Sequence, residues 1–270
     1  AARSGCAMPP MPPSAPDKDF PWWLVALGAI GLWLFYEVWA SPVYARVMAT
    51  LAKGIWITLL VTVVGFFSAA VLGLALALAG QSRHVVLRQA ARFYIEVVRG
   101  VPIIVLLLYV AFAATPALVW AWNTTGLPEV KARDVSLLWR AVIALTIAYS
   151  AFLAEVFRAG LASVHQGQIE AAQALGLTGW HRFRFIVFPQ AFRTILPPLG
   201  NDFVAMVKDS SLVSVLGVAD VTQLGKVTAA GNFRYFETYN TVALIYLTMT
   251  VTLSLLLRRL EARLRAKDAR

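Results

Sequence analysis

Long apolar segments are the feature of this sequence that most restricts its fold. The clearest one, Ile55–Ala79, is rich in Val, Leu and small residues and carries no charged side chain. A helix needs about 20 such residues to cross the hydrocarbon core of a bilayer. The whole chain is 59% apolar and only 14% charged, whereas soluble domains are nearer half apolar and a quarter charged. The sequence therefore predicts an all-α membrane protein.

Six segments are long and apolar enough to be expected as transmembrane helices. In chain order they are Trp22–Ala40, Ile55–Ala79, Phe93–Ala113, Arg140–Leu161, Phe203–Val218 and Thr241–Leu257. Tryptophans at both ends of the first segment, Trp22 and Trp39, suit a membrane interface. A cleaved signal peptide is the alternative for this segment. Because the Pro-rich lead is a poor n-region and no small-x-small cleavage site is convincing, we favour a retained anchor.

The remaining segments are expected to be tails, linkers and loops. Residues 1–20 are Pro-rich and polar, which favours a disordered tail. We expect Ser41–Lys53 to be an interfacial linker and both Thr115–Trp139 and Ala219–Tyr239 to be polar loops. The predicted organisation is a tail at 1–20, an extra N-terminal transmembrane helix at 21–40, a transmembrane domain at 41–260 with a polar insert at 162–190, and a basic tail at 261–270.

The distribution of positive charge predicts the orientation in the membrane. The net charge of +10 does not indicate nucleic-acid binding, because the basic residues flank the apolar segments. Fifteen of the 24 Lys and Arg residues lie on the side that holds both termini and the insert, seven lie on the other side, and two lie inside spans. Cytoplasmic segments of membrane proteins are enriched in Lys and Arg. We therefore expect both termini and the insert to be cytoplasmic.

The polar insert is expected to form a helix, a turn and a second helix. Ser163–Leu175 is rich in helix formers, and Gly176 can take the left-handed conformation that closes a helix. Thr178 can cap the second helix, which we expect Pro189 to interrupt or redirect. A structured connection of this length is unusual inside a compact bundle, so it is a candidate functional element.

A spaced motif lies within this insert. Glu170-Ala171-Ala172 is followed after three residues by Gly176, and Ile186-Val187-Phe188-Pro189 follows after nine more. The pattern resembles the E-A-A-x3-G-x9-I-x-L-P motif in the membrane subunits of bacterial ATP-binding-cassette (ABC) importers, with Phe188 where that family usually has Leu. The resemblance implies a coupling helix that docks into a groove of a separate ATPase. The residues implicated in ATPase coupling are Glu170, Ala171, Ala172, Gly176, Ile186 and Pro189.

A wider resemblance extends from about Lys53 to Leu264. It is to permeases of polar amino acids, a family that includes histidine, glutamine, glutamate, arginine and opine importers. The segments that carry it are Glu96–Pro102, Ala154–Gly160, Pro197–Asp202 and Met206–Leu212. This family implies a type I importer fold with a five-helix core in the bacterial cytoplasmic (inner) membrane, so Trp22–Ala40 would be an added anchor. It also implies a second permease subunit, two ATPases that bind ATP and Mg, and an extracytoplasmic amino acid binding protein.

Polar residues near the fifth expected span are candidates for the substrate pathway. They are Asn201, Asp202, Lys208, Asp209, Ser210 and Ser211. The first four fall within a wedge of about 120° on a helix, and charged groups inside a membrane are costly enough to suggest a function. Either these charges meet the carboxylate and ammonium groups of an amino acid, or Lys208 and Asp209 neutralise each other and brace the helix packing.

Two further charge pairs have i,i+3 spacing near the expected cytoplasmic boundary. They are Glu96 with Arg99 and Glu155 with Arg158. We interpret both as structural ion pairs, and a role in gating is the alternative.

Other activities find little support in the sequence. Gly225-Lys226 resembles part of a phosphate-binding loop, but Asp220 and Val227 stand where that loop needs Gly and Ser or Thr. The three histidines lack metal-ligand spacing, so we expect no metal or other cofactor on this chain. No span offers a catalytic arrangement of side chains, so we expect no enzyme activity. The alternative to ATP-driven import is an ATP-independent channel or secondary transporter, although no internal repeat supports the latter.

Overall fold

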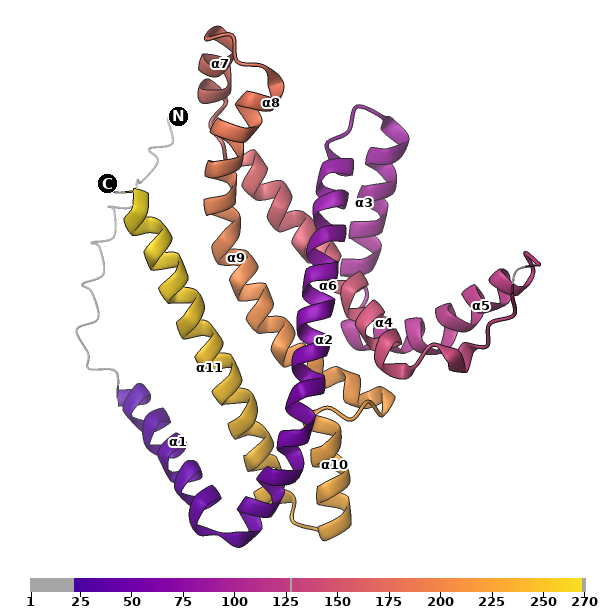
Figure 1. Cartoon of the computed structure of the whole chain (residues 1–270), viewed down its shortest axis with the longest axis vertical. Coiled ribbons are helices and arrows are strands. Elements are labelled where there is room, and N and C mark those ends of the chain that lie inside the picture. Colours follow the sequence, from indigo (N-terminus) through magenta and orange to yellow (C-terminus); the bar gives the residue numbers. More distant parts are fainter. Residues whose placement is uncertain (1–21, 127, 269–270) are drawn as a thin grey trace, which may run out of the picture.

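The structure describes residues 22–126 and 128–268, which form helices joined by turns and loops (Figure 1). The α-helices of this computed structural model are α1 (Trp22–Ala40), α2 (Pro42–Gly80), α3 (Val85–Gly100), α4 (Ile103–Tyr109), α5 (Thr115–Asn123), α6 (Leu137–Ala162), α7 (Gln166–Ala174), α8 (Gly179–Arg182), α9 (Phe188–Asp209), α10 (Val221–Asn232) and α11 (Tyr235–Asp268). Between them lie the π-helices η1 (Val110–Ala114) and η3 (Phe183–Val187) and the 3-10 helices η2 (Ala132–Asp134) and η4 (Ser210–Leu216). The all-α prediction is confirmed for these residues. The expected disordered tail 1–20 lies outside them.

Four helical segments within the described residues are long and apolar enough to cross a membrane. They are Pro42–Gly80, Ile103–Asn123, Leu137–Ala162 and Tyr235–Arg263. These segments support a multi-pass membrane protein. Helix α1 has the same bounds as the first expected span, Trp22–Ala40. Its crossing of the bilayer, and with it the count of six transmembrane helices, stays a prediction.

The core lies where α2 packs against α6 and α9. Its buried cluster includes Val61 of α2, Leu145 of α6 and Met206 of α9. Gly73 of α2 allows the close approach, because a Cβ there would lie 2.9 Å from the backbone carbonyl oxygen of Ser150 in α6. Small residues allow membrane helices to pack at short distance in this way. The other elements extend from this packed centre.

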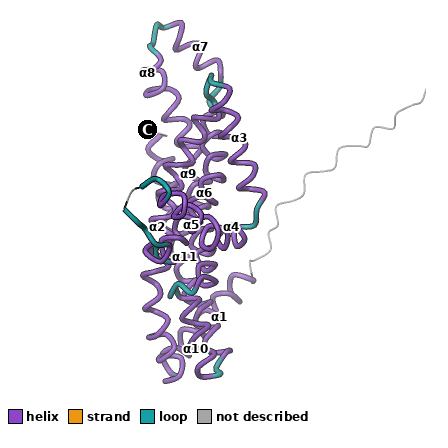
Figure 2. Tube along the Cα trace, turned by 90° about the vertical axis from the view of Figure 1, so that its right-hand side faces the viewer, coloured by secondary structure: helices purple, strands orange, loops and turns teal. Residues whose placement is uncertain are grey.

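The molecule is elongated, and its two ends carry different elements (Figures 1 and 2). Helices α7 and α8 lie at one end. The α2–α3 turn and the C-terminal end of α11 point toward the same end (Figure 1). Helix α10 and the junction between α1 and α2 lie at the other end. Helices α4 and α5 extend sideways from the middle as a lateral arm, so α7 and α8 are separated from both α10 and this arm (Figure 1).

The third expected span, Phe93–Ala113, is wrong as a single helix. Helices α3 and α4 are separate because Pro102 lacks an N–H group and favours an extended backbone at Val101 (φ −100°, ψ 132°). After this break the helix continues through η1 into α5. The expected loop Thr115–Trp139 therefore begins as helix and ends inside α6, so the apolar segment that could span the membrane lies further along the chain than predicted.

The helix after the insert also differs from the prediction. Helix α9 begins at Phe188, so Pro189 lies in its first turn and does not interrupt the second helix. A missing N–H group is tolerated at that position. The backbone stays helical from α8 through η3 to α9, and η4 forms most of the second half of the expected fifth span, Phe203–Val218. With Pro197 and Pro198 inside it, α9 is not among the four apolar segments.

Three segments expected to be linker, loop or tail are helical instead. Most of Ser41–Lys53 forms the first turns of α2, α10 lies inside the expected loop Ala219–Tyr239, and α11 extends into the expected tail 261–270. Pro42 occupies the start of α2, and Asp220 is the N-cap of α10. Both residues are helix start signals that a reading based on hydropathy overlooks.

Candidate functional site

The insert forms the helix, turn and helix that its sequence predicts. Gly176 has φ +74°, and its N–H group donates to the Gln173 carbonyl at 2.9 Å. The N–H group of Leu177 donates to the Ala172 carbonyl at 3.1 Å. These two bonds form a Schellman turn, in which a left-handed glycine ends a helix. The Thr178 hydroxyl then accepts a backbone N–H group of α8, so both helices of the hairpin have caps that hold the turn in one shape.

The motif residues divide into exposed and inward-facing positions. Glu170 and Ala171 are exposed, whereas Ala172 is the one buried residue of α7. Ile186 and Pro189 are half-buried where the hairpin joins α9. Helix α7 is thus anchored through one small side chain and presents most of its surface outward.

Large apolar side chains are exposed in the same hairpin. Leu175, Trp180 and Phe185 are 82%, 68% and 63% exposed. Arg184 lies beside Phe185, with its guanidinium carbon 5.9 Å from the ring centre. Several exposed apolar side chains in one short segment are typical of an interaction site. The spaced motif does not include these residues, and the aromatic density of residues 180–192 is the signal that points to Trp180 and Phe185.

The candidate pathway residues point to different neighbours. Asp209 is half-buried and accepts a hydrogen bond from the Tyr149 hydroxyl of α6 at 2.7 Å. Lys208 is exposed and lines a cavity of about 330 Å³ between α9 and α11, together with Arg258. The alternative in which Lys208 and Asp209 brace each other is therefore not what the structure contains. Tyr149, the actual partner of Asp209, was not singled out from the sequence.

The other four candidates lie on both sides of this pair along α9 and η4. Asn201 is exposed and Asp202 is half-buried, one helical turn or more before Lys208. Ser210 is buried, and its hydroxyl donates to the Val207 carbonyl at 2.7 Å. Ser211 is half-buried. The six candidates thus form a ladder of polar groups along one segment and do not converge on one point.

One of the two expected ion pairs is present. Arg158 donates to a single carboxylate oxygen of Glu155 through Nη2 at 2.6 Å and Nε at 3.0 Å. The expected Glu96–Arg99 pair is not formed. The guanidinium of Arg99 instead packs over the ring of Phe152 on α6, with its carbon 5.8 Å from the ring centre. Contact with the neighbouring helix thus takes the place of the i,i+3 pairing.

Arg140 has a structural role that the sequence did not suggest. Its buried side chain donates to the carbonyls of Ala111 at 2.7 Å and Val135 at 2.9 Å, and also to that of Ala132. Ala111 lies in η1, and the residue five positions on, whose N–H group a π-helical carbonyl would accept, is Pro116, which has none. Arg140 therefore holds the lateral arm to α6 through backbone groups.

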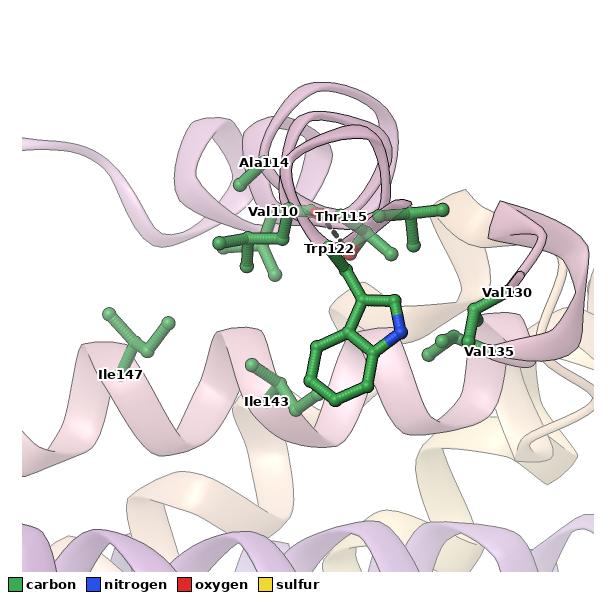
Figure 3. A pocket seen from close by; sticks show the side chains of 10 residues that line it. Val110, Ala114, Thr115, Trp122, Val130, Val135, Ile143 and Ile147 are labelled. Atoms are coloured by element: carbon green, nitrogen blue, oxygen red, sulfur yellow. Dashed lines mark hydrogen bonds between the residues drawn. The ribbon is translucent and has the colours of Figure 1, made fainter. Parts of the chain in front are cut away.

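An apolar cavity of about 310 Å³ lies between the lateral arm and α6. Figure 3 shows the indole of Trp122 pointing from α5 toward Ile143 of α6, with Val130 and Val135 on its far side. In the same view the Thr115 hydroxyl donates to the Val110 carbonyl at 2.7 Å. The lining is almost wholly apolar, so this cavity has no chemistry for a polar solute.

At the opposite end from the hairpin, Asp220 joins three helices. Its buried carboxylate accepts from the N–H groups of Gln223 at 2.8 Å and Thr222 at 3.2 Å, and from the Tyr246 hydroxyl at 3.1 Å. Burial raises the pKa of the Asp220 carboxyl above its usual value, and these donors oppose the shift. Gly54 of α2 completes the junction, because a Cβ there would lie 2.5 Å from the backbone nitrogen of Val221.

Comparison with known proteins establishes the family. Residues 69–266 match the family described as "Binding-protein-dependent transport system inner membrane component". The chain belongs to this family. Its apolar helices and its exposed hairpin are thus those of the membrane component of a binding-protein-dependent transport system.

Relatives within this family have names that refer to amino acids. The "Glutamine transport system permease protein GlnP" of Escherichia coli (strain K12) is 38% identical over 215 residues, which are 80% of this chain and 93% of the relative. The "Probable amino-acid permease protein YxeN" of Bacillus subtilis (strain 168) is 37% identical over 209 residues, 77% of this chain and 88% of the relative. These relatives confirm the resemblance to amino acid ABC permeases that the sequence motifs indicated.

A solved structure supports the same grouping. The "Crystal structure of an amino acid ABC transporter with histidines" contains a chain that is 36% identical to this one. The two superpose with a TM-score of 0.69, over 81% of this chain and 96% of the other. The helical arrangement described above is therefore shared with an ABC transporter of known structure.

Proposed function

We propose that this chain is the permease subunit of an ATP-driven importer that moves a polar amino acid across the bacterial cytoplasmic membrane. The observation that carries the proposal is the α7–α8 hairpin, which presents the Glu170–Ala172 motif at one end of a bundle of apolar helices. The amino acid permeases with 38% and 36% identity support the substrate class.

Helix α7 acts as the coupling helix in this proposal. The exposed Glu170 and the small side chain of Ala171 allow an ATPase groove to approach the helix closely. Gly176 fixes the angle of the hairpin, and Ile186 and Pro189 lie where it continues into α9. Because the backbone is helical from α8 through η3 to α9, a movement of the hairpin is passed to α9 without a flexible link.

The assembly expected around this chain has several parts. A second permease subunit completes the pathway, two ATPases bind ATP and Mg at the hairpin end, and an extracytoplasmic binding protein delivers the amino acid at the α10 end. The excess of Lys and Arg on the hairpin side supports a cytoplasmic position for that side and for both termini. Helix α1 is then a sixth transmembrane helix added to a five-helix core.

The polar ladder of α9 and η4 is proposed to line the substrate pathway. Lys208 is exposed and has no ion-pair partner among the described residues, so it is available to the carboxylate of an amino acid. Asp202 and Asp209 are available to its ammonium group, with Tyr149 holding Asp209 in place. Asn201, Ser210 and Ser211 belong to the same proposed pathway.

Reconstitution tests the proposed function. The chain is placed in proteoliposomes with its ATPase and binding protein, and uptake of labelled glutamine, glutamate, histidine and arginine is measured with and without internal ATP. We expect uptake of at least one of them that requires both ATP and the ATPase. Uptake by the isolated chain without ATP would instead support the channel or secondary-transporter alternative. In the same assay, Lys208→Gln should lower uptake more than Lys53→Gln, an equal charge change on exposed α2 surface.

A further inference from the structure

A charged cavity near the hairpin end has no role in the function proposed above. It has a volume of about 460 Å³ and lies between α2, α3 and α6. Part of its wall is apolar and comes from all three helices. The charged residues in its wall are Arg92, Glu96 and Arg99 of α3 and the Glu155–Arg158 pair of α6. The cavity thus combines apolar and ionic surface, as an amphipathic ligand requires.

Two arginines in this cavity have unused hydrogen-bond donors. Arg92 and Arg99 are exposed, lie two turns apart on α3, and form no hydrogen bond or ion pair with any described residue. The guanidinium of Arg99 lies over the ring of Phe152, a cation–π contact that leaves its N–H groups available. Glu96, between the two arginines, is also without such a bond. The excess charge of this part of the cavity is therefore positive.

The Glu155–Arg158 pair does not change the net charge of the cavity. Arg158 and Glu155 neutralise each other through the contact at 2.6 Å. Two guanidinium groups and one carboxylate remain to meet a ligand, which favours one with a single negative charge. Arginine is well suited to phosphate, because its planar group can donate two parallel hydrogen bonds.

The position of the cavity indicates where such a ligand comes from. Phe93, beside Arg92, is 72% exposed, and Val97 on the same helix is 48% exposed. These apolar side chains are suited to lipid, and the α2–α3 turn points toward the same end as the hairpin (Figure 1). Basic pockets between membrane helices on the cytoplasmic side bind anionic lipid headgroups.

We propose that this cavity binds the headgroup of an anionic phospholipid, with its phosphate on Arg92 and Arg99 and its acyl chains against the exposed apolar face of α3. Glu96 accepts a hydrogen bond from a headgroup hydroxyl. Phosphatidylglycerol, with one negative charge and a glycerol headgroup, has the matching chemistry. Its place in the cytoplasmic leaflet rests on the orientation proposed above, whereas the binding itself does not depend on transport.

Lipid binding to the purified full chain tests this proposal. Native mass spectrometry in detergent measures retention of phosphatidylglycerol, with phosphatidylcholine as the lipid without net charge. We expect one retained phosphatidylglycerol on the wild type, weakened roughly fivefold by Arg92→Gln and roughly thirtyfold by the Arg92→Gln/Arg99→Gln double variant. Arg83→Gln is the matched control, because Arg83 is exposed on the α2–α3 turn and does not line the cavity. It should bind phosphatidylglycerol like the wild type.

Three results would overturn the proposal. They are equal retention of phosphatidylcholine, unchanged retention by the double variant, and displacement of the lipid by millimolar glycerol phosphate, which would make the ligand a soluble phosphate. Thermal unfolding in phosphatidylcholine checks that the variants are folded. Because Arg92 has no bonded partner, Arg92→Gln alone keeps the test valid if the double variant is unstable. A failure of ATP-driven uptake in any lipid would count against the proposed function and leave this binding result unaffected.

Discussion

The two ends of the molecule are stabilised in different ways. At the α10 end, Asp220 links α10 to α11 through buried hydrogen bonds, and Gly54 brings α2 against the same backbone. At the hairpin end, the bonds around Gly176 are local caps, and large side chains such as Trp180 face outward. Both ends expose large side chains, since Phe233 and Phe236 at the α10 end are 80% and 67% exposed. The ends differ in their turns: Asp220 bonds across two helices and makes the α10 end an internal junction, whereas the caps at Gly176 and Thr178 bond only within the hairpin.

The largest loss of stability is expected from Asp220→Ala. This change removes the cap of α10 and the carboxylate acceptor of the Tyr246 hydroxyl, which keeps only its hydrogen bond with the Thr222 hydroxyl. We expect a loss of about 2–4 kcal/mol in the free energy of unfolding, measured by denaturation in detergent. Asp220→Asn keeps a capping oxygen and should lose less than half as much. An Ala variant as stable as the wild type would remove the basis for calling this end an internal junction.

Arg140→Met tests the lateral arm, which is held by buried hydrogen bonds as the α10 end is. Loss of the guanidinium leaves the Ala111 carbonyl without its donor. We expect a loss of about 1–3 kcal/mol in unfolding free energy and faster proteolysis of residues 124–131. Arg140→Lys keeps the charge but donates from a single nitrogen and not from a planar fork, so it should be intermediate. Equal proteolysis of all three proteins would contradict the role given to Arg140.

Gly176→Val should affect the hairpin alone. A β-branched side chain at φ +74° costs about 1–2 kcal/mol locally, and nothing else packs against this position. We expect hydrogen exchange in α7 and α8 to accelerate and ATP-driven uptake to fall, while the α2–α6 core stays protected. Gly176→Asn is the control, since Asn tolerates this conformation better. Loss of protection in α6 as well would show that the hairpin is not an independent end.

Local patterns predicted a large part of the fold. Apolar length identified the segments that became α2, α6 and α11, and Gly176 and Thr178 predicted the hairpin turn because caps depend on neighbouring residues only. Hydropathy could not separate α3 from α4 or find α10, since these depend on a proline break and on a buried N-cap at Asp220. In both cases the chain contained the signal, but tertiary packing decided its effect.

For the candidate site, the sequence predicted the motif but not the partners of the charged residues. The Glu170–Pro189 motif was recognisable because its spacing lies within one hairpin. The partners of the charged residues were not, because they lie on other helices: Asp209 bonds to Tyr149, and Arg99 packs on Phe152. Both Glu155–Arg158 and Glu96–Arg99 have i,i+3 spacing, but only the first pair is formed. Arg99 contacts Phe152 of the neighbouring helix instead, which spacing along one helix cannot predict.

The central claim, that the hairpin end is a docking surface for a separate ATPase, is tested most directly by Ala171→Trp. Ala171 is exposed, so the bulky side chain should leave thermal unfolding unchanged while it blocks close approach of a partner. Ala52→Trp makes the same change at an exposed position of α2 far from the hairpin. In proteoliposomes that contain the ATPase and binding protein, we expect Ala171→Trp to abolish ATP-driven uptake and Ala52→Trp to retain it. Full uptake by a stable Ala171→Trp variant would contradict the account.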